Sequence, residues 1–228
     1  MDEVYHVLNR GVDKRDIFKG KADYFRFIHD LYEFNDKQCI GTTYRAYQKN
    51  VKLYDIECRT MKRERELLVE NHAFCLMPNH YHICLSPLEI DSIPTYMHKI
   101  NMGYSKYFNI KNKRSGTLFE GRYKNILIEN ERQFSHILVY IHLNPLDLFM
   151  PEWRERGLNS QEINKCLKFL EDYRWSSHLD YLGKRNFPSV TQKDYFLKYF
   201  GGSEGYKNAL VVWLKAPKFG RVKNLMLE

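Results

Sequence analysis

The chain has 228 residues and a formal net charge of +8 at pH 7, enough length to bury a core without disulfides or structural metal. Its five cysteines include no Cys-x-x-Cys pair, which argues against a disulfide scaffold or thiolate zinc site and favours a reducing cytoplasm. We expect no secretory signal, and no membrane span at residues 71–88, because Pro78, Asn79 and three histidines interrupt that uncharged stretch. The basic excess indicates nucleic acid as the leading partner, although a generic basic protein would show the same charge.

A strand and a helix are predicted at the start of the chain. Apolar and polar residues alternate over residues 4–9, which predicts a strand that ends at Gly11. Aromatic and aliphatic residues at three- and four-residue steps over residues 24–34 predict an amphipathic helix on a sheet. Residues 39–66 break this pattern and are interpreted as a basic insertion, either a solvated face or an extra nucleic-acid contact.

Two strands are predicted on either side of Pro78, over residues 67–77 and 80–85, and they would be antiparallel neighbours. Side chains alternate along a strand, so His80 and His82 would share one face and Tyr81 would lie on the other. Two neutral imidazoles on one face can hold a metal ion. The simpler alternative is a strand that carries two histidines without a function.

Further elements follow in the second half of the chain. Ser92 is predicted to cap a helix over residues 93–108, and residues 117–128 a strand with a bend at Gly121. A capping box at Asn130 begins a helix that Pro145 ends. Beyond it the sequence predicts an irregular charged stretch, a compact segment from Tyr173 and a last helix, at residues 151–171, 173–177 and 203–213 respectively.

Tyr140 and Asn144 are four residues apart in the helix before Pro145, so they would lie together on one face of it. An asparagine oxygen is a plausible third ligand beside two imidazoles. The alternatives are a half-buried aromatic side chain and an ordinary helix terminator. His136, one turn before Tyr140, could contact DNA or supply an alternative ligand, and His142 points to the opposite side.

Six motifs in one order resemble the single-tyrosine HUH transposases of the IS200-like superfamily, most closely their REP-associated tyrosine transposase branch. They are MPNHYH at 77–82, YSKYFN at 104–109, GTLFEGRYK at 116–124, YIHLNP at 140–145, YHVLNRG at 5–11 and YRWSS at 173–177. In that family an aliphatic residue usually stands between the two histidines, so Tyr81 is a mild departure that keeps the hydrophobic character.

The resemblance implies a set of functional residues. His80, His82 and Asn144 would bind a divalent metal, Mg²⁺ or Mn²⁺, and Tyr140 would attack a DNA phosphate to leave a 5′-phosphotyrosine and a free 3′-OH. Two imidazoles alone would suit zinc or another transition metal equally well. The candidate phosphate contacts are basic residues near the motifs, namely Arg10, Lys14, Arg15, Arg114, Arg122 and Lys124.

The resemblance also implies an α+β, ferredoxin-like HUH nuclease fold, with a central antiparallel sheet flanked by helices and a C-terminal helical extension. The catalytic domain would span residues 1–150 and the extension residues 151–228. The implied activity is metal-dependent cleavage and rejoining of single-stranded DNA near a hairpin, either a REP-like element or a transposon end. The protein would act as a monomer or a homodimer, and no membrane partner is expected.

The sequence has two alternative interpretations besides a DNA-cleaving enzyme. One is a catalytically silent regulator that binds DNA or RNA and keeps the fold. The other is a two-histidine phosphoesterase, which needs His-x-Thr or His-x-Ser pairs, and none of the nine histidines is followed that way.

Overall fold

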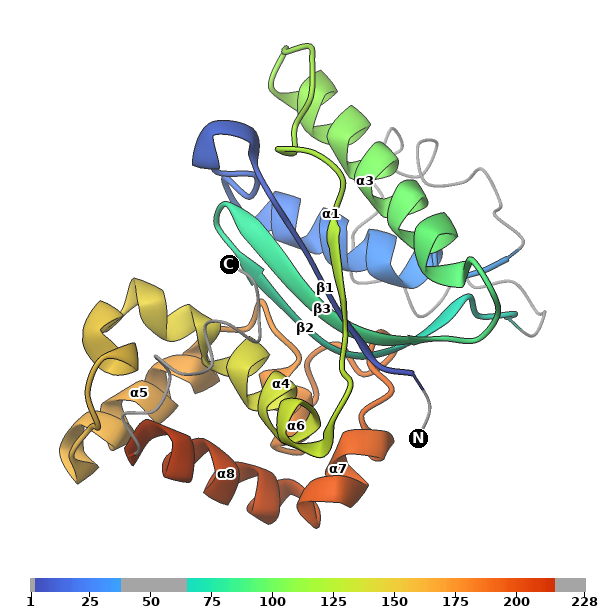
Figure 1. Cartoon of the computed structure of the whole chain (residues 1–228). Helices are drawn as coiled ribbons and strands as arrows, with labels where there is room; N and C mark the ends of the chain where they lie inside the picture. Colours follow the sequence, from blue (N-terminus) through green and yellow to red (C-terminus); the bar gives the residue numbers. More distant parts are fainter. Residues whose placement is uncertain (1–2, 38–64, 216–228) are drawn as a thin grey trace.

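The computed structural model describes residues 3–37 and 65–215, so nearly all of the insertion predicted at 39–66 lies outside the described residues (Figure 1). Within them, four strands form one antiparallel sheet in the order β2-β3-β1-β4. The strands are β1 (Tyr5–Arg10), β2 (Val69–Met77), β3 (His80–Pro87) and β4 (Lys124–Leu127).

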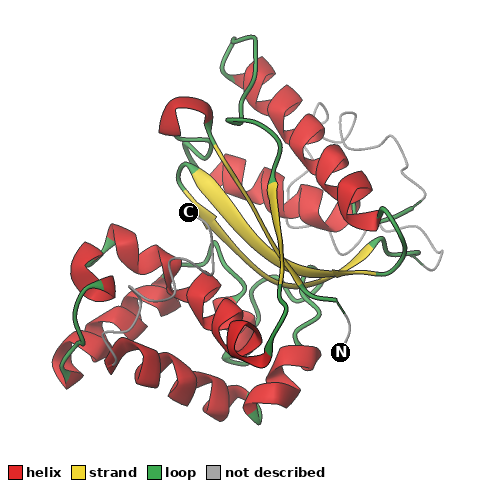
Figure 2. Cartoon of the chain, viewed as in Figure 1, coloured by secondary structure: helices red, strands yellow, loops and turns green. Residues whose placement is uncertain are grey.

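Two helices cover one face of this sheet, α1 (Lys21–Glu33) and α3 (Ser92–Lys111), and α4 (Glu131–Leu143) covers the other (Figures 1 and 2). The chain order β1, α1, β2, β3, α3, β4 with this strand order is the ferredoxin-like arrangement. The predicted α+β class and its central antiparallel sheet are therefore confirmed.

Further helices follow α4 and lie with it on the same side of the sheet (Figure 2). They are the 3-10 turns η3 (Asn144–Leu148) and η4 (Pro151–Arg154) and the helices α5 (Ser160–Asp172), α6 (His178–Tyr181), α7 (Asp194–Phe200) and α8 (Ser203–Lys215). The predicted helical extension is thus present. Another 3-10 turn, η1 (Val12–Lys14), follows β1.

The sheet separates two apolar clusters, and strand alternation decides which residues enter each. Val7, Tyr81 and Ile83 pack with α1 and α3. Cys75 and Cys84, both buried free thiols, pack instead with α4 and with α5 to α8. The C-terminal helices therefore share one core with the helix that carries Tyr140.

The start of α4 follows the predicted capping pattern in part. The Asn130 side chain accepts a hydrogen bond from the Gln133 backbone N–H at 2.9 Å, as an N-cap residue does. The Gln133 side chain accepts from the Glu129 N–H at 2.7 Å instead of that of Asn130. The cap is confirmed, and the reciprocal bond is shifted by one residue.

Two predicted elements differ from the structure, and a third agrees with it. Residues 151–171 are not irregular, because η4 and α5 occupy most of them. The helix α4 does end before Pro145, as predicted, at Leu143, and Pro145 lies in the first turn of η3, where a missing N–H costs little. Ser92 is the first helical residue, and its hydroxyl accepts from the Glu89 N–H while Asp91 stands at the N-cap.

The strand predicted over residues 117–128 is shorter, because only Lys124–Leu127 form β4. Before it, the chain makes an isolated bridge from Phe119 to Gly11 and continues irregularly. The apolar residues Leu118 and Phe119 are buried against the α1 and α3 side, so their burial resembled a strand pattern.

The segment predicted to begin a compact piece, residues 173–177, lies along β2. Ser176 forms a bridge with Cys75, the Leu76 N–H donates to the Trp175 carbonyl at 2.9 Å, and the Tyr173 hydroxyl donates to the Leu76 carbonyl at 2.6 Å. This segment therefore covers the outer edge of the sheet. No helix in the described part of the chain is long and apolar enough to cross a membrane.

Candidate functional site

The strand register places the two histidines of the motif on the face toward α4. His80 lies opposite Arg10 of β1, and His82 lies opposite Leu8. Their rings are edge-to-face with centroids 4.9 Å apart. Tyr81 points to the other face, where its hydroxyl donates to the Asn101 side chain at 2.8 Å. The predicted alternation of these three residues is confirmed.

His82 contacts a third histidine, His6, across the same face. His6 Nε2 and His82 Nδ1 are 2.9 Å apart and share a hydrogen bond, and the two rings stack with centroids 5.1 Å apart. Burial lowers the pKa of His6 to about 3 and the pKa of His82 well below its usual value, and the neighbouring His80 and His6 lower the latter further. Both imidazoles are therefore neutral near pH 7, the state in which histidine binds metal.

His80 is held by the residue before it. Its Nδ1 lies 2.6 Å from the side-chain oxygen of Asn79. The Asn79 amide also donates from Nδ2 to the Lys14 carbonyl at 3.2 Å, and the Asn79 carbonyl accepts from the Gly11 N–H at 2.8 Å. The turn before β3 is thus fastened to the loop that follows β1.

Tyr140 of α4 lies beside the histidines. Its ring meets the His82 ring edge-on with centroids 5.6 Å apart, and the His6 ring at 5.9 Å. The residue is only 4% exposed, so its ring is wedged between the helix and the sheet. The structure therefore brings Tyr140, the candidate nucleophile, into contact with His82, from which it is separated by about 60 residues along the chain.

Asn144 is fully buried one turn later, at the C-cap of α4. Its Nδ2 donates to the Tyr140 carbonyl at 3.1 Å, and its Oδ1 accepts from Arg154 Nη2 at 2.7 Å. Arg154 also binds both carboxylate oxygens of Asp147 at 2.9 Å and lies over the Tyr140 ring, 5.2 Å from its centroid. An arginine from η4 therefore connects the amide and the tyrosine.

Of the three predicted metal ligands, the two histidines suit a divalent ion best. Two neutral imidazoles are good ligands for such ions. The Asn144 oxygen already accepts from Arg154, but an amide oxygen has a second lone pair, so it retains acceptor capacity. Among the described residues, no group of three or more His, Cys, Asp or Glu side chains is placed to hold a metal. The Asn144 amide therefore stays the predicted third ligand.

Two of the predicted phosphate contacts lie on the same face as the histidines. Arg10 is directly opposite His80, and Lys124 of β4 is opposite Leu8, which itself is opposite His82. Directly opposed residues in an antiparallel pair project to one face. The sheet therefore places Arg10 beside His80, and Lys124 on the same face one strand further away, across Leu8 from His82.

Lys14 and Arg15 lie on the loop after β1. This loop is anchored by Pro78, whose carbonyl accepts from the backbone N–H groups of Ile17 at 2.8 Å and Phe18 at 3.0 Å. Arg15 Nε donates within the loop to the Val12 carbonyl at 2.9 Å. Both basic residues are thus held next to the turn that precedes His80.

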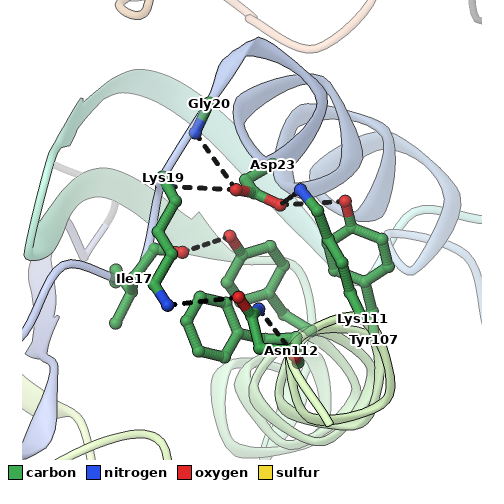
Figure 3. Close-up of polar contacts among 9 residues, drawn as sticks. Ile17, Lys19, Gly20, Asp23, Tyr107, Lys111 and Asn112 are labelled. Carbon is green, nitrogen blue, oxygen red and sulfur yellow. Dashed lines mark hydrogen bonds and ion pairs between the residues drawn. The ribbon is translucent and has the colours of Figure 1, made fainter.

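A buried carboxylate fixes the far end of this loop (Figure 3). Asp23 accepts from the backbone N–H groups of Lys19 at 2.9 Å and Gly20 at 3.2 Å, and from the Tyr107 hydroxyl at 2.9 Å. Lys111 of α3 forms an ion pair with the same carboxylate. The start of α1 is therefore joined to the end of α3, which limits how far the loop can move.

The other predicted contacts lie elsewhere. Arg114 donates to the Asn109 side chain at 2.8 Å and the Thr117 carbonyl at 2.9 Å, which holds the turn after α3. Arg122 is exposed in the irregular stretch before β4. The His136 ring meets Trp213 of α8 at 4.3 Å. His142 is fully buried and shares hydrogen bonds of 2.7 Å with Ser177 and Tyr206, so it links α4 to the C-terminal part of the chain.

Sequence reasoning missed His6 and Arg154. The alternation around His6 was visible, but its contact with His82 depends on the register between β1 and β3, which no local pattern reveals. Arg154 lies in a stretch predicted to be irregular, and only the tertiary fold brings it to Asn144. No sequence signal that we recognise would have identified Arg154.

Comparison with known proteins gives two findings. Residues 41–144 match the family described as "Transposase IS200 like", a span slightly under half of the chain that includes His80, His82, Tyr140 and Asn144. A solved structure of a REP-associated tyrosine transposase bound to a REP hairpin is similar with a TM-score of 0.46 and 13% identity, covering 85% of this chain and 86% of that one. No curated protein matches. The resemblance indicated by the motifs is thus confirmed over residues 41–144, where the chain is similar to the IS200-like transposases.

Proposed function

We propose that the protein cleaves and rejoins single-stranded DNA through Tyr140, with a divalent metal held by His80 and His82. The observation that carries this proposal is the juxtaposition of the Tyr140 and His82 rings, 5.6 Å apart, inside the stretch that matches the IS200-like transposases. The basic side chains of Arg10 and Lys124 on the same face support a DNA substrate.

The reaction would begin with attack by the Tyr140 phenol oxygen on a backbone phosphorus. A tyrosine–phosphorus bond forms, the bond from phosphorus to the 3′ oxygen breaks, the phenol proton leaves to solvent, and the 3′ oxygen takes up a proton. A bound divalent ion would supply neutralisation of charge on the phosphate. Since the tyrosine ester retains the energy of the phosphodiester, a second 3′-OH can reverse the step and join strands.

The residues around Tyr140 would set its geometry. The wedge between α4 and the sheet restricts its ring, and Arg154 and Asn144 hold the helix end beside it. Asn144 Oδ1 is proposed as a third ligand through its remaining lone pair. Arg10 and Lys124 would bind phosphates on either side of the cleaved bond.

The likeness to the REP-associated branch suggests a hairpin as the DNA element, and we include that in the proposal. The basic residues Lys14 and Arg15 on the loop after β1 are then candidates for contacts to the hairpin stem.

The decisive test uses a labelled single-stranded hairpin oligonucleotide incubated with Mn²⁺ or Mg²⁺ and run on a denaturing gel. We expect a covalent protein–DNA adduct with the unchanged chain and none with Tyr140→Phe, which removes only the nucleophilic oxygen. Tyr199→Phe, a change to an exposed tyrosine of α7 outside the site, serves as the matched control and should leave the adduct intact. An adduct that persists in Tyr140→Phe would refute the nucleophile.

One observation favours a second function, a regulator that binds nucleic acid without cleaving it. Tyr140 is almost fully covered and Asn144 is engaged by Arg154, an arrangement that would also suit a silent site. Hairpin binding that weakens steeply with salt, with no adduct under any divalent ion, would support this regulator over the enzyme.

A further inference from the structure

Each histidine of the motif uses its Nδ1 atom in a hydrogen bond within the chain. His80 Nδ1 lies 2.6 Å from the side-chain oxygen of Asn79, and His82 Nδ1 lies 2.9 Å from His6 Nε2. A ring nitrogen engaged in this way cannot also bind a cation. A metal ion held by the pair would therefore be bound through both Nε2 atoms.

The bond from Asn79 fixes the protonation of His80. The Asn79 amide donates from Nδ2 to the Lys14 carbonyl at 3.2 Å, and a carbonyl can only accept, so this contact sets which end of the amide faces His80. The Asn79 oxygen can itself only accept, so His80 Nδ1 must carry the proton and donate it. In the neutral ring His80 Nε2 is then the lone-pair nitrogen that a metal requires.

His6 contacts His82 from another strand, and the direction of their shared hydrogen bond sets the His82 tautomer. It lies opposite Cys84, two residues along β3 from His82, so the two imidazoles are diagonal neighbours on one face of the sheet. When His82 Nδ1 donates to His6 Nε2, His82 Nε2 is left as the lone-pair atom. The stacked rings, with planes 18° apart, also restrict rotation of the His82 ring.

The placement of His6 has a cost that packing alone would not justify. The side chain is 1% exposed, and its Nδ1 has no hydrogen-bond partner among the described residues. A buried polar group without a partner costs about 1–3 kcal/mol, and an aliphatic side chain would avoid that cost. A role for the other nitrogen, the one that meets His82, accounts for a histidine here.

We infer that His6 and Asn79 are positioning residues that fix the Nε2 atoms of His82 and His80 for a divalent cation, a role that rests on the metal-dependent function proposed above. Outer partners of this kind hold a ligand's tautomer and orientation, and their loss commonly weakens metal binding about 10- to 100-fold. Neither residue touches the DNA or the ion in this scheme, so each acts through the histidine that it contacts.

The first test measures affinity for Zn²⁺ alone by titration calorimetry, without DNA. His6→Leu and Asn79→Ala remove the partner of Nδ1, and we expect each to lower the affinity about 10- to 100-fold. The conservative changes keep an acceptor at the same reach, because a glutamine oxygen can occupy the position of His6 Nε2 and an aspartate oxygen that of Asn79 Oδ1. His6→Gln and Asn79→Asp should therefore bind Zn²⁺ within a few-fold of the unchanged chain.

Two controls accompany these variants. His98→Gln removes an exposed imidazole on α3 and should leave Zn²⁺ affinity unchanged. Thermal unfolding of each variant shows that it is folded, and Asn79, which is only partly buried, keeps the test valid even if the buried His6→Leu change prevents folding.

A second measurement reads the tautomers directly. Long-range ¹H–¹⁵N correlation spectra of the metal-free protein should show the proton on Nδ1 of both His80 and His82. In His6→Leu the Nδ1 preference of His82 should weaken while that of His80 stays.

The outcomes separate the inference from the function beneath it. If the unchanged chain binds neither Zn²⁺ nor Mn²⁺, the metal-dependent function is wrong, and the positioning role is overturned with it. If the unchanged chain binds Zn²⁺ but the His6→Leu and His6→Gln variants bind it with equal affinity, only the positioning role is overturned. The same conclusion follows if the spectra place the proton on Nε2.

Discussion

Arg154 joins three groups around the candidate nucleophile. It donates to the Asn144 oxygen and to both Asp147 oxygens, and its guanidinium lies over the Tyr140 ring. Arginine can do this because its donors form a planar fork that lysine lacks.

Replacing Arg154 by leucine should destabilise the protein by about 1–3 kcal/mol, because the buried Asn144 oxygen loses its donor. Urea unfolding of the purified variant measures this change. Arg154→Lys is the matched control: it retains the charge for Asp147 but cannot reach both partners, so its loss should be intermediate. A free energy of unfolding that equals that of the unchanged chain in Arg154→Leu would contradict the connection.

Local sequence patterns predict only part of the candidate site. That His80 and His82 share a face follows from alternation alone, and that Tyr140 and Asn144 are neighbours follows from helix geometry. The contact between the histidine strand and the helix of Tyr140 depends on the packing of α4 on the sheet. Only the family resemblance predicted that packing. His6 needed the strand register as well, and no local pattern contains it.

At the scale of elements, α4 depends on its N-cap. Asn130→Ala removes the acceptor for the Gln133 N–H and should cost about 1 kcal/mol of stability. Asn130→Asp keeps an acceptor, and its carboxylate is stabilised by the positive end of the helix dipole. This variant should therefore retain the stability that Asn130→Ala loses. Thermal or urea unfolding measures both variants. Equal stability of the alanine and aspartate variants would show that the bond contributes nothing.

The helix α5 could have been predicted and was not. Asn159 and Glu162 form a complete capping box, and Ile163, Cys166 and Leu170 recur at helical spacing with their side chains buried. The charged residues between them obscured a pattern that was present. By contrast, the short β4 could not have been predicted, because Leu118 and Phe119 are buried for a reason outside their own segment.

At the scale of the whole molecule, the C-terminal helices belong to the core of the predicted catalytic part. The apolar cluster that contains Leu138 and Ile141 of α4 also contains Leu170, Tyr206 and Leu210. We expect a chain cut after residue 150 to expose this face and to lose cooperative unfolding. Calorimetry of the truncated and full chains would detect the loss, and a sharp transition of the shortened chain would support the boundary predicted at residue 150.

Buried histidines make the stability depend on pH. Burial lowers the pKa of His178 to about 4 and the pKa of His142 well below its usual value. In the unfolded chain a histidine has a pKa near 6.5, so between about pH 6.5 and 4 the unfolded state binds more protons. Stability is therefore full above about pH 6.5 and is lost as the pH falls, by roughly 1.4 kcal/mol per pH unit for each such histidine.

Urea unfolding at pH 7.5, 6 and 5 measures this dependence. His178→Asn keeps an atom near the Nδ1 position, which meets the Tyr206 hydroxyl at 2.6 Å, and removes the titration. The variant should therefore lose less stability between pH 6 and 5 than the unchanged chain. Identical losses would exclude His178 as a source of the acid sensitivity.

The segment of residues 173–177 along β2 has a consequence for association between chains. Hydrogen bonds from Leu76 and Tyr173 occupy that side of the sheet, and among the described residues the opposite side ends at the four-residue strand β4. In this sheet of the described residues, the edge left for backbone pairing with another polypeptide is therefore the short strand β4. A sheet that is covered at one edge and ends in a short strand at the other resists edge-to-edge association between chains.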